Sequence, residues 1–218
     1  MEQHIEREID DLRQRLLYMG VYTERILKQA VDALLNKDKQ LAEKVKENDV
    51  LLDRMLIEMD DFVMSLLAEA PLASDLRFVV MGMKISQNLE RIGDEARRIA
   101  NRAFDLADRN YPFVDEVQNL SKMVVQMVRF SMDAFETQNV KIANEVIEKD
   151  KEVDILYMEL RQKLEQDMLN HSDNIFVNLQ LINIAKRLER ISDIATNIAE
   201  EVIYIYEAKD VRIKPENK

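Results

Sequence analysis

The chain has 218 residues, of which 47% are hydrophobic and 33% charged, and its formal net charge at pH 7 is −11. A chain of this length can bury one or two hydrophobic cores beneath a charged surface. The acidic charge and the few aromatic residues, six Tyr, seven Phe and no Trp, argue against nucleic acid as a partner, because nucleic acids are bound by basic stripes and stacking platforms. The lack of cysteine excludes disulfides, thiolate nucleophiles and cysteine-ligated metals.

The sequence carries no signal for a membrane or for export. No window approaches the roughly 20 consecutive apolar residues of a spanning helix. The N-terminal stretch MEQHIEREIDDLRQ has neither the basic start nor the apolar segment of a signal peptide. We therefore expect a cytoplasmic protein without direct membrane insertion.

Glycine and proline are rare, with three residues each. This favours an all-α fold, because β-rich chains need many more turn residues. The glycines are too far apart for a phosphate-binding loop, a dinucleotide fingerprint or a nucleophile elbow. Since no nucleophile and base occur in a recognisable arrangement, we predict no catalytic residues, no site for an organic cofactor and no enzymatic activity.

Turn residues and apolar periodicity predict six long helices. The first three cover roughly 5–36, 38–69 and 74–109, with Pro71 as a breaker and Ser74 as the expected N-cap of the third. Pro112 separates the halves, and the second half repeats the plan over roughly 113–138, 139–170 and 174–208. The predicted fold is all-α, with two tandem three-helix bundles at residues 1–110 and 111–218, built from antiparallel helices.

The two halves are related in sequence. The stretch NLERIGDEARRIA at 88–100 returns as RLERISDIATNIA at 187–199, and eight of the twelve positions in 89–100 are identical to those in 188–199. The stretches DVLLDRMLIE at 49–58 and DKEVDILYME at 150–159 share their acidic positions. A repeat of this length is too long for a solenoid unit and indicates a duplicated bundle.

Acidic residues recur together with an apolar seam, which is the stripe of apolar residues at heptad spacing that includes Leu89 and Ile92 in the first copy and Leu188 and Ile191 in the second. With Leu89 and Ile92 in the heptad seam, Glu90 and Asp94 fall on the side turned away from it. Residues four apart on a helix have Cβ atoms about 5 to 6 Å apart, so two carboxylates can share one cation. Four such pairs are matched between the two copies: Glu90 with Asp94, Glu189 with Asp193, Asp49 with Asp53, and Asp150 with Asp154. A solvated charged face would also place acids at these positions, and that interpretation stays open.

The stretches DLRFVVMGMKISQNLERIGDEARRIA (75–100) and LERISDIATNIAEEVIYIYE (188–207) closely resemble the PhoU family of bacterial phosphate-signalling proteins. The resemblance covers nearly the whole chain. It implies a homodimeric cytosolic regulator that associates with the phosphate ABC transporter ATPase and a sensor histidine kinase, and keeps phosphate-starvation genes off at high phosphate. It also implies surface multinuclear iron or zinc clusters. The carried-over metal ligands are Glu90, Asp94, Glu189 and Asp193, with Asp49, Asp53, Asp150 and Asp154 across the groove.

The two copies differ where the family pattern has asparagine. The second copy keeps Asn197, but the first has Arg98, whose guanidinium can neutralise the carboxylates in place of a cation. The sequence therefore favours the second bundle as the metal site. Two alternative functions remain: a metal-free helical scaffold or adaptor, and a carboxylate-bridged metalloenzyme. The metalloenzyme is disfavoured because His4 and His171 are not in the Glu-x-x-His spacing of di-iron bundles.

Overall fold

The computed structural model describes residues 2–67 and 72–211, and all regular secondary structure within these residues is helical. The elements in chain order are α1 (Glu2–Leu35), α2 (Lys39–Leu67), α3 (Ala73–Leu106), α4 (Val114–Thr137), α5 (Val140–Asn170), a short 3₁₀ helix η1 (Ser172–Asn174) and α6 (Ile175–Glu207). The predicted all-α fold with six long helices is confirmed. The predicted bounds differ from these by three residues at most, and the predicted end of the second helix at 69 lies outside the described residues.

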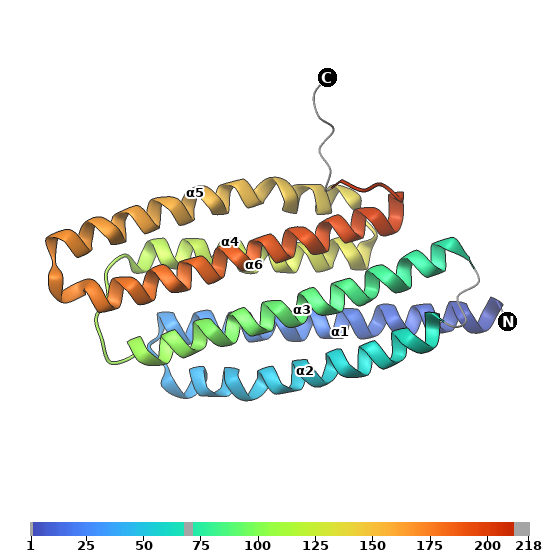
Figure 1. Cartoon of the computed structure of the whole chain (residues 1–218), viewed down its shortest axis with the longest axis horizontal. Coiled ribbons are helices and arrows are strands. Elements are labelled where there is room, and N and C mark those ends of the chain that lie inside the picture. Colours follow the sequence, from blue (N-terminus) through green and yellow to red (C-terminus); the bar gives the residue numbers. More distant parts are fainter. Residues whose placement is uncertain (1, 68–71, 212–218) are drawn as a thin grey trace, which may run out of the picture.

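The helices form two three-helix bundles that lie side by side (Figure 1). The first bundle contains α1, α2 and α3, and the second contains α4, α5 and α6. The two meet mainly along α3 and α6, which run in opposite directions, while α1 and α4 make a smaller contact. Because α3 and α6 each pack against helices of both bundles, they are the most enclosed elements of the fold.

The apolar seam predicted from the heptads forms the core. Leu89, Ile92 and Ile99 of α3 are fully buried, as are Leu188 and Ile191 of α6. Helices of about 30 residues are stable only when such a stripe is buried against neighbours, so the seam explains their length.

Gly93 allows α2 to approach α3 closely. It sits on α3 facing α2, and a Cβ atom at this position would lie under 3.0 Å from Leu52 Cδ2 and 3.4 Å from an oxygen of Asp49. The second copy has Ser192 at the equivalent place, where it is fully buried. A small residue at this position therefore fixes the spacing at which the acids of the two helices face one another.

The connections between the first and second helix of each bundle have the same construction. Lys37 and Gln138, which end the turns, both have a left-handed backbone with φ of 56° and 57°. The residues that follow them, Asp38 and Asn139, each accept a hydrogen bond from a backbone N–H in the next helix with a side-chain oxygen, at 2.9 and 3.0 Å. The duplication seen in sequence therefore extends to the turns.

The predicted N-cap of the third helix is wrong. Helix α3 begins at Ala73, so Leu72 occupies the cap position and makes no side-chain cap hydrogen bond. Ser74 lies inside the first turn, where its hydroxyl contacts the carboxylate of Asp75 at 3.4 Å. The helix starts two residues earlier than a cap at Ser74 would require, so Ser74 cannot serve as its cap.

A polar and aromatic cluster joins the bundles near one end. Arg13 of α1 donates a hydrogen bond to the Tyr206 hydroxyl of α6 at 2.7 Å. The Arg13 guanidinium also lies over the Phe78 ring of α3, whose centroid is 5.9 Å from that of Phe135 on α4. One cluster thus includes side chains from four helices, two from each bundle.

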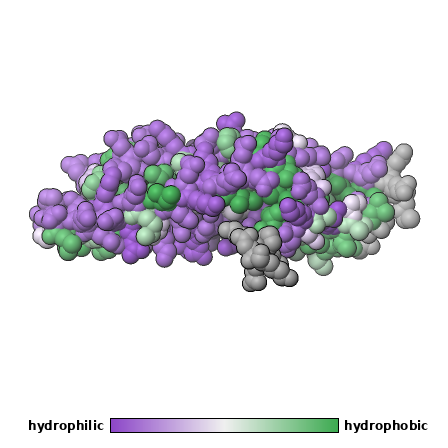
Figure 2. Space-filling model, turned by 90° about the horizontal axis from the view of Figure 1, so that it is seen from above, coloured by the Kyte–Doolittle hydropathy of each residue, from purple (hydrophilic) through white to green (hydrophobic). Residues whose placement is uncertain are grey.

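The face of the molecule above α5 is mostly hydrophilic (Figure 2). Figure 2 shows the face above α5 in the view of Figure 1, where apolar side chains form small separate groups in a hydrophilic surface. Among the helices of residues 2–67 and 72–211, none is apolar over a long enough stretch to cross a membrane.

Candidate functional site

The first carboxylate cluster consists of Asp49 and Asp53 on α2 and Glu90 and Asp94 on α3. Asp49 is buried, with 5% of its surface exposed, while Glu90 and Asp94 are half-buried and Asp53 is exposed. The sequence places Glu90 and Asp94 on the side of α3 turned away from the seam. That side is not open to solvent, because α2 covers it and leaves both acids half-buried.

Neighbouring charges of the first cluster act on the pKa of Glu90 and of Asp49. Burial raises the pKa of Glu90, and the charges of Asp94 and Asp53 raise it further. Burial also raises the pKa of Asp49, which Arg97 opposes and Asp53 reinforces. The cluster therefore favours a cation that would relieve its repulsion.

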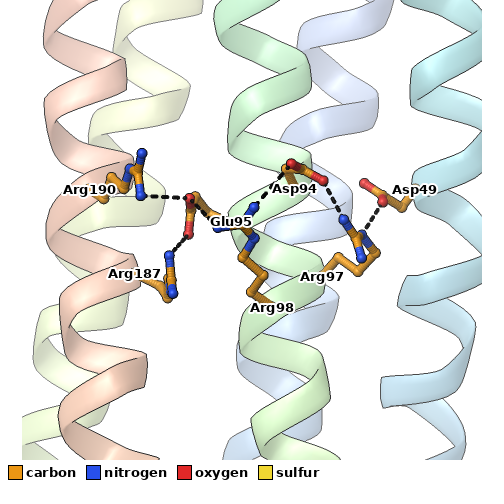
Figure 3. Close-up of polar contacts among 7 residues, drawn as sticks. All are labelled: Asp49, Asp94, Glu95, Arg97, Arg98, Arg187 and Arg190. Carbon is orange, nitrogen blue, oxygen red and sulfur yellow. Dashed lines mark hydrogen bonds and ion pairs between the residues drawn. The ribbon is translucent and has the colours of Figure 1, made fainter.

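Arg97 supplies a cation from within the chain. Its Nη2 donates a hydrogen bond to Asp94 Oδ1 at 2.6 Å, and its Nε lies 2.5 Å from Asp49 Oδ2 as an ion pair without good hydrogen-bond alignment. The hydrogen bond to Asp94 raises the pKa of Arg97. Arg98, the residue expected to neutralise the cluster, reaches only Asp94 there, at 3.6 Å. Figure 3 shows Arg97 between α3 and the Asp49 side chain on α2.

The second carboxylate cluster consists of Asp150 and Asp154 on α5 and Glu189 and Asp193 on α6. Asp150 and Glu189 are half-buried, and the other two are exposed. Burial raises the pKa of Asp150, Glu189 and Asp193. The charge of Asp154 adds to each rise. The structure thus brings together the same four positions in both halves, as the repeat predicts.

The second cluster contains no guanidinium equivalent to Arg97. Thr196 stands at that position, and its hydroxyl oxygen is buried without a hydrogen-bond partner. One carboxylate oxygen of Asp150 is likewise buried and unpartnered. Within the described residues, no lysine or arginine comes within ion-pair distance of the four acids in this cluster. Its negative charge is therefore not compensated by direct contact.

The donor atoms of both clusters are carboxylate oxygens, which suit hard or borderline cations. In the part of the chain that the structure describes, no three acidic or histidine side chains converge closely enough to coordinate one ion. Holding a metal would thus require side chains of a cluster to turn inward. By charge and donor type the second cluster fits a cation, whereas Arg97 already occupies the first.

Glu95 is the polar residue that the sequence interpretation missed. It has 4% of its surface exposed and points from α3 toward α6 (Figure 3), about 100° around the helix from Asp94. Its carboxylate contacts Arg187 at 3.1 Å and Arg190 at 3.5 Å across the bundle interface, and Arg98 at 3.5 Å on its own helix. The equivalent residue of the second copy is the buried Ile194. This difference between the copies, a charged residue in one and an apolar residue in the other, is the sequence signal from which Glu95 could have been found.

Arg91 and His171 have structural partners outside the two clusters. Arg91 donates a hydrogen bond to Asn88 on its own helix at 3.2 Å. His171 lies beside the Asp167 carboxylate at 2.8 Å in the turn before α6, far in sequence from either cluster. Such an exposed turn histidine does not supply the inward Glu-x-x-His ligands of a di-iron bundle.

The duplicated bundle and its two matched acidic clusters agree with a known sequence family. The PhoU domain matches residues 16–103 and 117–202 of this chain. The chain belongs to the PhoU family. Each matched PhoU stretch contains all four acids of one cluster. The sequence resemblance to this family is thereby confirmed. The division into two domains at residue 110 stays a prediction.

Individual PhoU relatives are similar over nearly their full length. The chain is 37% identical to the phosphate-specific transport system accessory protein PhoU homolog of Pseudomonas aeruginosa, over 97% of this chain and 89% of the relative. The homolog of Clostridium acetobutylicum is 32% identical, with 94% and 95% covered.

Two solved PhoU structures share the fold. The crystal structure of PhoU from Pseudomonas aeruginosa superposes with a TM-score of 0.91 at 36% identity, covering 94% of this chain and 99% of that one. The phosphate transport system regulatory protein PhoU from Streptococcus pneumoniae gives a TM-score of 0.90 at 27% identity, covering 96% and 100%. The relatives named in these comparisons are accessory or regulatory proteins of phosphate transport.

Proposed function

We propose that this chain is a cytoplasmic regulator of phosphate uptake and phosphate-starvation signalling. In this proposal it is an adaptor between the ATPase of the phosphate ABC transporter and a sensor histidine kinase, and it represses phosphate-starvation genes when phosphate is plentiful. It acts as a homodimer without catalytic activity, and it binds neither nucleic acid nor the bilayer directly.

One observation carries the proposal: the similarity to phosphate transport accessory proteins extends over both repeats and the tertiary structure. A relative that shared only one bundle would support the fold but not the function. The acidic, mostly hydrophilic surface and the extended helices also suit a protein that docks on others.

The regulatory role is tested by deleting the gene and measuring phosphate-responsive transcription at high phosphate. We expect transcription to rise several-fold in the deletion strain and to return to the repressed level when the full-length chain is restored. Affinity capture of the chain from phosphate-replete and starved cells identifies the partners, and light scattering on the purified protein checks the dimer. If deletion leaves transcription at high phosphate unchanged, the regulatory proposal is wrong.

The proposal includes a metal role for the second cluster, with iron or zinc as the ion. Asp150, Asp154, Glu189 and Asp193 would hold it, and their burial and mutual repulsion favour a cation. When bound, such an ion supplies positive charge that ties α5 to α6. The four carboxylates of α5 and α6 would be the groups that hold the ion.

Elemental analysis of protein purified without chelator tests this role. We expect iron or zinc in the wild type, and its loss in the variant that combines Glu189→Ala with Asp193→Ala. The matched control combines Glu90→Ala with Asp94→Ala in the first cluster and should keep its metal. No bound metal in the wild type, together with full regulatory function of the Glu189 and Asp193 variant, contradicts this role.

A metal-free adaptor is the second candidate function. It is favoured by Arg97, which compensates one cluster from within, and by the lack of a converged set of three ligands in the described residues. The metal analysis above separates the two candidates. A carboxylate-bridged metalloenzyme is less well supported, because neither cluster faces the inside of a bundle or includes a histidine.

A further inference from the structure

The two carboxylate clusters are equivalent position by position but differ in one neighbouring residue. Arg97 lies beside the first cluster, and Thr196 stands at the same place beside the second. The difference does not follow from packing, because both residues are partly exposed on the same side of their helices. It changes the charge next to four acids by one unit.

The position of the Arg97 guanidinium is that of a bridging cation. It contacts a carboxylate of α2, Asp49, and a carboxylate of α3, Asp94, at 2.5 and 2.6 Å. The Asp49 side chain is only 7% exposed, so this contact lies within the helix interface rather than on the surface. A bridging metal ion would need oxygens from the same two helices.

We infer that Arg97 is the resident cation of the first cluster and keeps metal out of the first bundle, so that any metal the chain binds is held by the second cluster alone. A metal ion entering the first cluster would have to displace the Arg97 guanidinium from both carboxylates. The displaced guanidinium would then remain beside the ion as a second positive charge. In the second cluster, Thr196 is neutral and imposes neither cost. The part of this inference that concerns the second cluster rests on the proposed metal role, whereas the part that concerns Arg97 does not.

An ordinary salt bridge is the competing explanation. In that case removing Arg97 would change stability but would not create a metal site, because the four carboxylates would still not converge on one ion. The exchange of residues between the copies separates the two explanations. Arg97→Thr makes the first cluster resemble the second, and Thr196→Arg does the reverse.

The experiment uses the full-length chain, stripped with chelator, dialysed and titrated with Zn²⁺ or Mn²⁺. Bound metal per chain is measured by elemental analysis after gel filtration, and affinity by competition with a metal indicator. The second cluster is silenced by Asp150→Asn with Asp154→Asn, so that any remaining ion belongs to the first. In this silenced background we expect no specific binding with Arg97 present, and at least one ion per chain with Arg97→Thr.

Complementary variants complete the test. Thr196→Arg in the otherwise native chain should weaken metal binding at least tenfold. Arg102→Thr, which removes an exposed arginine of α3 paired with Asp105, is the matched control and should bind like the wild type. Arg97→Met keeps more of the side-chain volume and serves if the threonine variant loses helical structure by circular dichroism.

Each outcome decides the inference. Metal retained by the silenced chain with Arg97 in place overturns it, as does a failure of both Arg97 variants to gain metal in that background. If the native chain binds no metal but the Arg97 variants do, the role of Arg97 stands and the proposed metal role of the second cluster fails. Regulation of phosphate-responsive transcription is a separate measurement and does not enter this test.

Discussion

Replacing Glu95 by glutamine is expected to weaken the contact between the two bundles. The carboxylate is 4% exposed and faces Arg187 and Arg190 of the other bundle at 3.1 and 3.5 Å. Glutamine has nearly the same shape, so the packing is kept while the negative charge is lost. Two arginines then face one another and Arg98 without their shared counter-charge.

The size of this effect follows from burial. Breaking a fully buried ion pair costs about 3 to 5 kcal/mol, because one charge is left uncompensated. Here the Arg187 and Arg190 side chains are 29% and 49% exposed, so water can replace part of the lost interaction. We expect Glu95→Gln to reduce the free energy of unfolding by about 1 to 2 kcal/mol. Asp105→Asn, in a pair with 46% of both side chains exposed, should cost less than about 0.5 kcal/mol.

Guanidinium denaturation followed by far-ultraviolet circular dichroism measures both variants against the wild type. If the bundles unfold together, the midpoint of Glu95→Gln falls while the slope is unchanged. If the bundles separate first, a second transition appears. The reasoning is refuted if Glu95→Gln changes the free energy of unfolding by no more than Asp105→Asn does.

Two further predictions concern the clusters and are measured in the same denaturation assay, with chelator present. Gly93→Ala should destabilise the protein by about 1 to 2 kcal/mol, because the new methyl group overlaps Leu52. This cost of overpacking exceeds the gain in helix propensity of about 1 kcal/mol. The control is Gly82→Ala, whose Cβ would meet leucine side chains at 3.2 and 3.3 Å and which should be nearly neutral. Asp150→Asn should stabilise the protein at pH 7 by less than about 1 kcal/mol after solvent screening, because burial raises the pKa of this acid and so disfavours its charged form in the folded state. The wild type recovers this stability as the pH falls through the raised pKa, and below the ordinary value of 3.8 the difference should vanish; an advantage that persists at low pH would point to packing instead.

Much of the candidate site was predictable because it depends on repetition. Asp49 and Asp150 were matched by the offset between the copies, and the structure places each within its cluster. Their degree of burial was not predictable from the heptads of α3, since a heptad describes contact on one face only. Helix α2 covers a second face of α3, and this contact encloses Asp49 of α2 almost completely.

The arginine of the first cluster was likewise not predictable from the sequence pattern alone. Arg97 and Arg98 are adjacent in sequence and about 100° apart around the helix. The family pattern drew attention to Arg98, but the helix rotation directs Arg97 toward α2 and leaves Arg98 between Asp94 and Glu95. A shift of one position along the helix thus decides which side chain reaches the acids of the neighbouring helix.

The sequence by itself determined the helical class, the duplication and the identity of the matched acids, because these depend on composition and spacing along a single chain. Only the tertiary structure decided how the bundles are joined, since α3 and α6 meet through residues that are distant in sequence. It made Glu95 a buried contact between bundles, and it set Arg97 between two carboxylates while the second cluster kept an unpartnered oxygen on Asp150. The physical reason is that burial and charge compensation are properties of the space between helices, which periodicity along one helix does not describe.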